Sequence, residues 1–190
     1  MDDGSLLLAD AAAWRSWLDV NEDASDGVWL VMAKSGTVVP TSLKYAQALD
    51  EALCSGWIDG QRRKRDGTTF LQRFTPRRAK SIWSQRNVGL VEALIAQGRM
   101  RSRGRAEIER ARLDGRWARA YPGSSAMDVP EDVATALAES PLATQRFAEL
   151  DSGRRYALLL SIITAPPELR GRRVAAMIRR LEAPDPSPSR

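Results

Sequence analysis

The sequence predicts an α+β protein: a small antiparallel or mixed sheet packed with helices, followed by an all-helical C-terminal part. Three observations support this prediction. Residues 28–34 form a nearly continuous apolar run rich in β-forming residues. Residues 57–74 hold two strand-like segments separated by an Asp66-Gly67 turn signal. From residue 130 onward, apolar residues recur at helical spacing.

A proline- and glycine-containing segment, Tyr121–Ser125, is the clearest linker in the chain. We therefore expect an α+β main domain over residues 1–121 and a helical domain over residues 126–182. The last residues, 183–190, are rich in proline and are expected to be a disordered tail.

The first expected helix covers Asp10–Val20, with Asp10 as its N-cap and an apolar face at i, i+3 and i+4. The apolar run Val28–Lys34 follows as a buried strand. The next helix is expected to begin with Ser42 as N-cap and to end at Gly56, because glycine commonly terminates helices.

Residues 57–59 and 70–74 are expected to pair as a hairpin with a basic arm, which Pro76 ends. A helix beginning at Lys80 or Ser81 and running to Gln97-Gly98 should follow, and a second helix should cover Arg103–Ala120. The C-terminal helices are expected at residues 130–139, 140–150, 153–164 and 168–181.

Charge is distributed unevenly along the chain. Residues 1–59 carry 3 basic and 10 acidic side chains, residues 60–120 carry 17 and 5, and residues 121–190 carry 9 of each. The chain has no histidine and one cysteine. Cys–His chemistry is therefore excluded and a structural zinc site is disfavoured, so we expect no cofactor and no metal. The single cysteine, and an acidic N-terminus unlike a secretory signal, favour a cytoplasmic protein with no membrane span.

The basic middle third contains the candidate binding residues. Arg77, Arg78 and Lys80 precede the helix expected near Ser81, whose N-terminus would attract an anion. Ser capping with ordinary surface arginines is the alternative. The full set of candidate ligand-binding residues is Asp59, Arg77, Arg78, Lys80, Ser81, Trp83, Ser84 and Asn87.

Arginines interleaved with Phe70, Phe74 and Trp83 could also form a nucleic-acid surface, with phosphates neutralised and bases stacked. The alternative is that these aromatic residues belong to the core beneath a solvated basic face. Cys54 lies on the apolar face of its helix, which is typical of a buried cysteine.

Four features, in order, resemble a known family: VWLVMAKSG; LKYAQA leading into EALCSGWIDG; RFTPRRAKSIWSQRN; and LIAQGRM followed by ARLDGRW. They resemble the YdeI/OmpD-associated (OmdA) family, also called bacteriocin-protection proteins. The C-terminal part, from VPEDVATAL to the arginine-rich last helix, is similar to the helical domain that gives the family its name. The resemblance implies a bacterial cytoplasmic α+β protein linked to antimicrobial-peptide tolerance, and it brings no established reaction.

We therefore expect a non-enzymatic stress-tolerance protein that binds a small anionic ligand or a protein partner. Three alternatives stay open: a nucleic-acid-binding protein, an enzyme acting on a small anionic substrate with Asp59 as acid or base and Arg77 orienting the substrate, and a structural interaction module whose C-terminal helices dock another protein. The sequence does not fix the oligomeric state.

Overall fold

The computed structural model describes residues 4–183. The contacts between residues divide the chain into two compact units. The first consists of Met1–Ser81 and Asn87–Trp117, and the second of Ile82–Arg86 and Ala118–Arg190. Most of the predicted tail, residues 184–190, lies outside the described residues.

The first unit is built on a four-stranded mixed sheet with strand order β1-β2-β4-β3. Its strands are β1 (Ser5–Leu6), β2 (Val28–Ala33), β3 (Trp57–Lys64) and β4 (Thr69–Pro76). β1 runs parallel to β2, while β2 and β3 both pair antiparallel with β4. The predicted buried strand and hairpin are confirmed, and β1 was not predicted because two residues are too short to show alternation.

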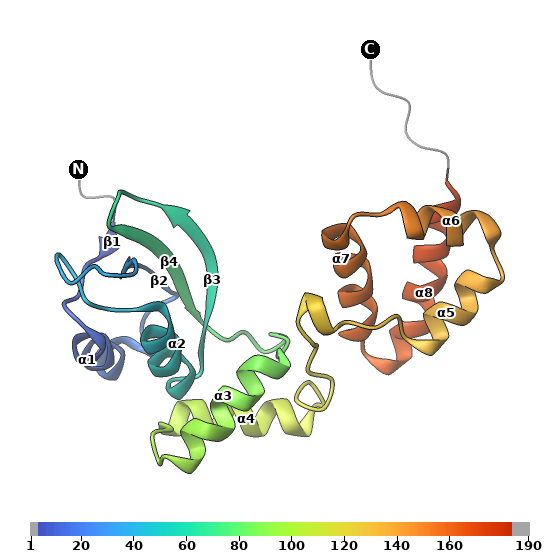
Figure 1. Cartoon of the computed structure of the whole chain (residues 1–190). Helices are drawn as coiled ribbons and strands as arrows, with labels where there is room; N and C mark the ends of the chain where they lie inside the picture. Colours follow the sequence, from blue (N-terminus) through green and yellow to red (C-terminus); the bar gives the residue numbers. More distant parts are fainter. Residues whose placement is uncertain (1–3, 184–190) are drawn as a thin grey trace. The chain divides into compact units, whose positions relative to one another are not determined.

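Helices α1 (Ala11–Asn21) and α2 (Tyr45–Cys54) cover one face of this sheet (Figure 1). Trp14 of α1 is fully buried, packs against Phe74 of β4 with ring centroids 5.7 Å apart, and donates its indole N–H to the Ala48 carbonyl at 3.1 Å. The predicted N-cap is confirmed, since the Asp10 carboxylate accepts from the Ala13 N–H at 2.9 Å.

The predicted N-cap of the second helix was wrong. α2 begins after Lys44, whose backbone N–H donates to the Gln47 side chain at 3.0 Å. Ser42 instead donates both its N–H and its hydroxyl to the Ala9 carbonyl, at 2.8 and 3.1 Å, so it joins two loops.

The first unit also contains α4 (Ser102–Leu113) and, from Asn87 onward, α3 (Gln85–Ala96). α4 ends seven residues earlier than predicted, because Gly115 adopts the left-handed φ of 75° that terminates helices. The Trp117 N–H then turns back to the Ala111 carbonyl at 2.9 Å.

The second unit is helical, as predicted, with a short 3-10 turn at Ser124–Ala126. Its helices are α5 (Glu131–Ala138), α6 (Pro141–Glu149), α7 (Ser152–Ile163) and α8 (Pro167–Glu182). A separate apolar core joins them, centred on Val133, Phe147, Ile162 and Met177. Arg170 of α8 donates two hydrogen bonds to Asp132 of α5, at 2.6 and 2.8 Å, which lowers the pKa of that carboxyl. No helix in the described part of the chain is long and apolar enough to cross a bilayer.

Cys54 is fully buried at the end of α2, as predicted from its place on the apolar face. Burial raises the pKa of its thiol to about 11. Since the thiolate is the reactive species, we expect iodoacetamide to alkylate the folded protein at pH 8 at roughly one hundredth of the rate seen in urea. Mass spectrometry of timed samples measures both rates, and equal rates would contradict this burial.

Candidate anion-binding surface

The eight residues predicted to bind a ligand divide between the two units. Trp83 and Ser84 belong to the second unit, and the other six belong to the first. Trp83 is buried, and its carbonyl accepts from the Tyr121 N–H at 2.9 Å, while Ser84 forms a β-bridge with the same residue. These two residues therefore hold the linker in place through the backbone.

The expected helix N-terminus near Ser81 is not there, so that prediction was wrong. The Ser81 hydroxyl accepts from the Arg78 N–H at 2.9 Å and closes a turn over residues 78–81. The chain then stays extended to bridge with Tyr121, and α3 begins only at Gln85. Arg78 and Lys80 are exposed on the turn, but no helix end lies next to them to strengthen anion binding.

The remaining candidates take part in the fold of the first unit. Arg77 is 6% exposed and its backbone N–H donates to the Gly56 carbonyl at 3.0 Å. Asn87 is buried at the start of α3. Asp59 accepts a hydrogen bond from the Tyr45 hydroxyl at 2.7 Å, which ties β3 to α2. Asp59 and Arg77 thus each take part in the fold of the first unit, Asp59 through its side chain and Arg77 through its backbone N–H.

Internal ion pairs use part of the basic charge of the middle third. Arg99 donates to the buried Glu51 carboxylate at 2.7 Å, and Arg101 donates to Asp19 at 2.8 Å. Three more arginines form internal ion pairs in the same unit: Arg103 with Asp23, and Arg110 and Arg116 with Glu107. The charges of these arginines are compensated within the fold. Since Glu51, Asp19 and Asp23 lie outside residues 60–120, the excess of 17 basic over 5 acidic side chains in that segment overstates the charge that a partner would meet.

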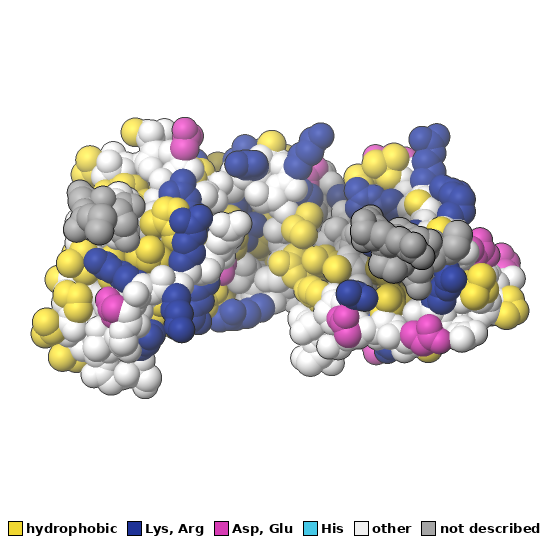
Figure 2. All heavy atoms as spheres, turned by 90° about the horizontal axis from the view of Figure 1, so that it is seen from above, with side chains coloured by type: hydrophobic (Ala, Val, Ile, Leu, Met, Phe, Trp, Pro, Cys, Tyr) yellow, Lys and Arg dark blue, Asp and Glu magenta, His cyan; other side chains and the backbone are white. Residues whose placement is uncertain are grey.

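The β3–β4 hairpin differs in this respect. Its cations Arg62, Arg63, Lys64 and Arg73 form no ion pair or side-chain hydrogen bond with any residue in the range 4–183. The first three are exposed, and Arg73 is half-buried. We call these four residues the hairpin surface. Figure 2 shows a row of Lys and Arg side chains over the first unit, at the left of the view.

A β-bulge determines which way these arginines point. Asp59 pairs with Phe74 and Arg62 pairs with Gln72, so β3 carries one residue more than β4 over this stretch. Gln72, 3% exposed, fills the bulge by donating to the carbonyls of Gly60 and Gln61, at 2.8 and 3.2 Å. The bulge thereby shifts Arg62 and Arg63 to the opposite faces from those that a regular ladder would give.

Each arginine then lies over an aromatic ring on its own face. The Arg62 guanidinium carbon is 3.8 Å from the Phe70 ring centroid, and that of Arg63 is 4.1 Å from the Trp29 ring. Arg73 pairs directly with Trp29 across β2 and β4, so it shares the face of Arg63. The aromatic rings support the guanidinium groups, and both arginines are exposed, so their N–H donors remain accessible to a partner.

The hairpin turn is fixed independently of the arginines. The Asp66 carboxylate accepts from the hydroxyl of Thr69 at 2.6 Å and from the N–H groups of Thr68 and Thr69, at 2.8 and 2.7 Å. These bonds, the Thr69 hydroxyl first, hold the pKa of Asp66 well below its usual range. Lys34, directly after β2, donates to the Asp66 carbonyl at 2.6 Å and so also supports the turn. The predicted Asp66-Gly67 turn is therefore confirmed.

Sequence reasoning named the basic arm but did not place its arginines among the site residues. The signal was present, because Gln61–Arg65 is a run of polar and charged residues in a strand, which is typical of an exposed edge. Phe70, Phe74 and Trp83, the aromatic residues that could have stacked on bases, are all buried, as the core alternative predicts. No cluster of three or more metal-binding side chains occurs within the described residues.

Comparison with protein families assigns both parts of the chain. Residues 6–107, more than half of the chain, match the family described as a domain of unknown function, DUF8412. The chain belongs to the DUF8412 family. Residues 126–183 match a second family, OmdA, described as bacteriocin-protection, YdeI or OmpD-associated. The resemblance found in the sequence is thus confirmed for the helical part, while most of the quoted N-terminal motifs fall in the DUF8412 match. Curated proteins and solved structures gave no match.

Proposed function

We propose that this DUF8412 protein is a non-enzymatic binding protein whose hairpin surface holds an anionic partner. One observation carries the proposal: four cations on one hairpin are left without a carboxylate, whereas Arg99, Arg101 and Arg103 of the same unit are paired with acids. Stacking on Phe70 and Trp29 keeps two of them extended, so an anion that binds them would freeze fewer side-chain rotamers.

The arrangement favours an extended partner with repeated phosphate or carboxylate groups. Arg62, Arg63 and Lys64 are consecutive residues at the end of the edge strand β3, so their side chains alternate between its two faces, and Arg73 lies on the neighbouring strand β4. A nucleic acid would be held through its phosphates and read without sequence preference, because Phe70 and Phe74 are buried and cannot stack on bases.

Less supports an enzyme acting through Asp59 and Arg77. The half-buried Asp59 carboxylate already accepts a hydrogen bond from Tyr45, and Arg77, which is 6% exposed, is not presented to a substrate. The OmdA domain connects the proposal to bacteriocin tolerance. A basic protein repels cationic peptides, so we propose an indirect, cytoplasmic role, which the single cysteine also favours.

Removing the two stacked charges tests the proposal. The double variant Arg62→Gln/Arg63→Gln is expected to bind a labelled single-stranded oligonucleotide, inorganic polyphosphate or polyglutamate more weakly than wild type. Each lost phosphate contact should reduce the slope of log K against log salt by about 1. Fluorescence anisotropy and competition at a low and a near-physiological salt concentration measure the affinity and the slope.

The matched control is Arg78→Gln/Lys80→Gln. It removes the same charge from exposed residues beyond the other end of β4, where the sequence had placed the site. We expect this variant to retain most of the wild-type affinity. Equal losses in the two double variants would mean that only net charge matters, and a larger loss in the control would return the site to the Arg78–Ser81 turn. Either result overturns the proposal.

A further inference from the structure

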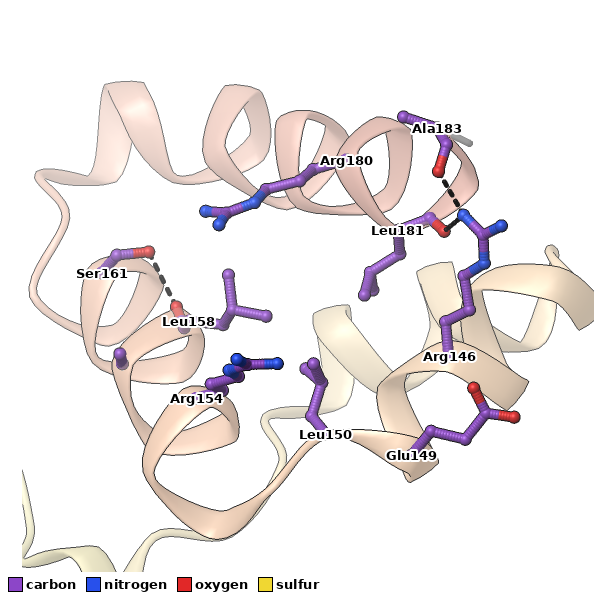
Figure 3. Close-up of a pocket in the computed structure, with 10 residues that line it drawn as sticks. Arg146, Glu149, Leu150, Arg154, Leu158, Ser161, Arg180, Leu181 and Ala183 are labelled. Atoms are coloured by element: carbon purple, nitrogen blue, oxygen red, sulfur yellow. Dashed lines mark hydrogen bonds between the residues drawn. The ribbon is translucent and has the colours of Figure 1, made fainter. Parts of the chain in front are cut away.

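The helical second unit contains a cavity of about 540 Å³ that the hairpin surface does not involve (Figure 3). It opens between α6, α7 and α8. Its volume lies within the range of sites that hold small organic molecules. The lining residues that matter are Arg146, Leu150, Arg154, Leu158, Arg180 and Leu181.

The floor of the cavity is apolar and continuous with the core of the unit. Leu181 is 6% exposed and belongs to that core, while Leu150 and Leu158 are half-buried and pack against it. These leucines therefore present fixed apolar surface to the opening. A molecule with an aliphatic body would remove this surface from water, which is favourable.

The rim is cationic. Arg154 of α7 and Arg180 of α8 approach from different helices, and Leu158 lies between their guanidinium groups in Figure 3. Arg180 forms no ion pair with any described residue. Arg154 faces Asp151 at 3.3 Å, but both side chains are mostly exposed, so this pair contributes little.

Arg146 adds a third cation that is held in place. Its guanidinium donates to the carbonyls of Leu181, at 2.9 Å, and Ala183 at the end of α8. These acceptors are neutral, so the charge of Arg146 is not compensated by them. Glu149 is the one acid among the residues lining the cavity, which leaves two positive charges in excess.

We propose that this cavity binds an amphiphilic anion, a carboxylate or phosphate headgroup on an aliphatic body. Arg154 and Arg180 hold the headgroup with paired N–H donors, and Leu150, Leu158 and Leu181 hold the aliphatic body. The two surfaces of the chain thus differ in kind: the hairpin offers exposed charge along a strand, whereas this cavity combines charge with an apolar floor.

Calorimetric titration of the full chain with decanoate, below its micellar concentration, tests the proposal. Decanoate is expected to bind at one site, while decanol, which lacks the charge, and acetate, which lacks the chain, bind at least tenfold more weakly. Arg154→Gln/Arg180→Gln should weaken decanoate binding by about tenfold for each arginine removed.

The control pair Arg172→Gln/Arg179→Gln removes the same charge from exposed positions of α8 that do not line the cavity, and it should leave decanoate affinity unchanged. Equal losses in both pairs, equal affinities for decanol and decanoate, or no decanoate binding would overturn the proposal.

Vesicles containing phosphatidylglycerol identify the source of the ligand. Sedimentation with them that Arg154→Gln/Arg180→Gln abolishes indicates a lipid headgroup, and decanoate binding without it indicates a soluble amphiphile. We expect Arg154→Gln/Arg180→Gln to bind the oligonucleotide as wild type does, because the hairpin surface is unchanged.

Discussion

Replacing Gly104 by alanine is expected to lower the free energy of unfolding of the first unit by about 3 kcal/mol, at the upper end of the usual cost of overpacking. Gly104 lies in the first turn of α4, against the last turn of α2. A Cβ atom there would stand 2.2 Å from the carbonyl oxygen of Cys54 and 2.9 Å from its carbonyl carbon. These are backbone atoms, so they cannot move aside as a flexible side chain would.

Two further features keep α2 and α4 close together near Gly104. The Cys54 carbonyl accepts the Arg101 N–H at 3.1 Å, and Gly56, with φ of 71°, lets the chain leave α2 close to α4. A Cβ on Gly56 would stand 3.3 Å from the Arg103 carbonyl. The added methyl group of Gly104→Ala must therefore push α4 away from α2 and break the bond from Arg101.

Urea unfolding followed by tryptophan fluorescence measures this effect, because five of the six tryptophans belong to the first unit. Gly89→Ala is the matched control. Gly89 is an exposed glycine inside α3 with no atom within 4 Å of an added Cβ, so alanine should stabilise by about 1 kcal/mol through helix propensity. Faster alkylation of Cys54 in Gly104→Ala would locate the damage at the α2–α4 contact. An unchanged midpoint in that variant would show that the contact is looser than described.

Local signals in the sequence account for most of the fold. Asp10 begins α1, the apolar run beginning at Val28 is β2, and Asp66-Gly67 turns the hairpin, because each is set by residues close together in the chain. The errors occur where distant residues decide. The extended backbone before α3 depends on Tyr121, which is 37 residues beyond its bridge partner Ser84, and no local pattern reveals that pairing.

Residues distant in the sequence also limited the prediction of the candidate site. The sequence located the basic charge correctly in the middle third, but whether an arginine is available to a partner depends on acids elsewhere in the chain. Arg99 pairs with Glu51, 48 residues away, and Arg101 with Asp19, 82 residues away. Gln72 also looks like an ordinary strand residue, although its amide fills the bulge that orients Arg62.

The substitution Glu51→Gln is expected to lower the free energy of unfolding of the first unit by about 3 kcal/mol, the cost of leaving a buried charge cluster without its partner. Glu51 is 3% exposed. Its carboxylate accepts from Arg15 at 2.6 and 3.0 Å and from Arg99 at 2.7 Å, with Arg101 at 3.7 Å. The expected loss is at the lower end of the range for buried pairs, because Arg15 is half exposed and can turn toward water.

The same substitution should change the pH dependence of stability. Burial alone would raise the pKa of Glu51, but the hydrogen bonds from Arg15 and Arg99 outweigh it and lower the pKa below its ordinary 4.5. The folded state therefore favours the charged form. The advantage of wild type over Glu51→Gln should be complete above about pH 4.5 and should disappear as the pH falls through the lower, folded-state pKa.

Asp50→Asn is the control, because the neighbouring carboxyl behaves in the opposite way. Burial raises the pKa of Asp50 more than Arg99, 3.7 Å away, lowers it, so folding disfavours its charged form. At neutral pH this variant should be slightly more stable than wild type, and its advantage should fade as Asp50 is protonated in acid. Urea midpoints measured at intervals from neutral pH down to about pH 3 distinguish the expected loss of stability in Glu51→Gln from the expected gain in Asp50→Asn. Parallel curves for Glu51→Gln and wild type would show that the arginines do not hold Glu51 ionised.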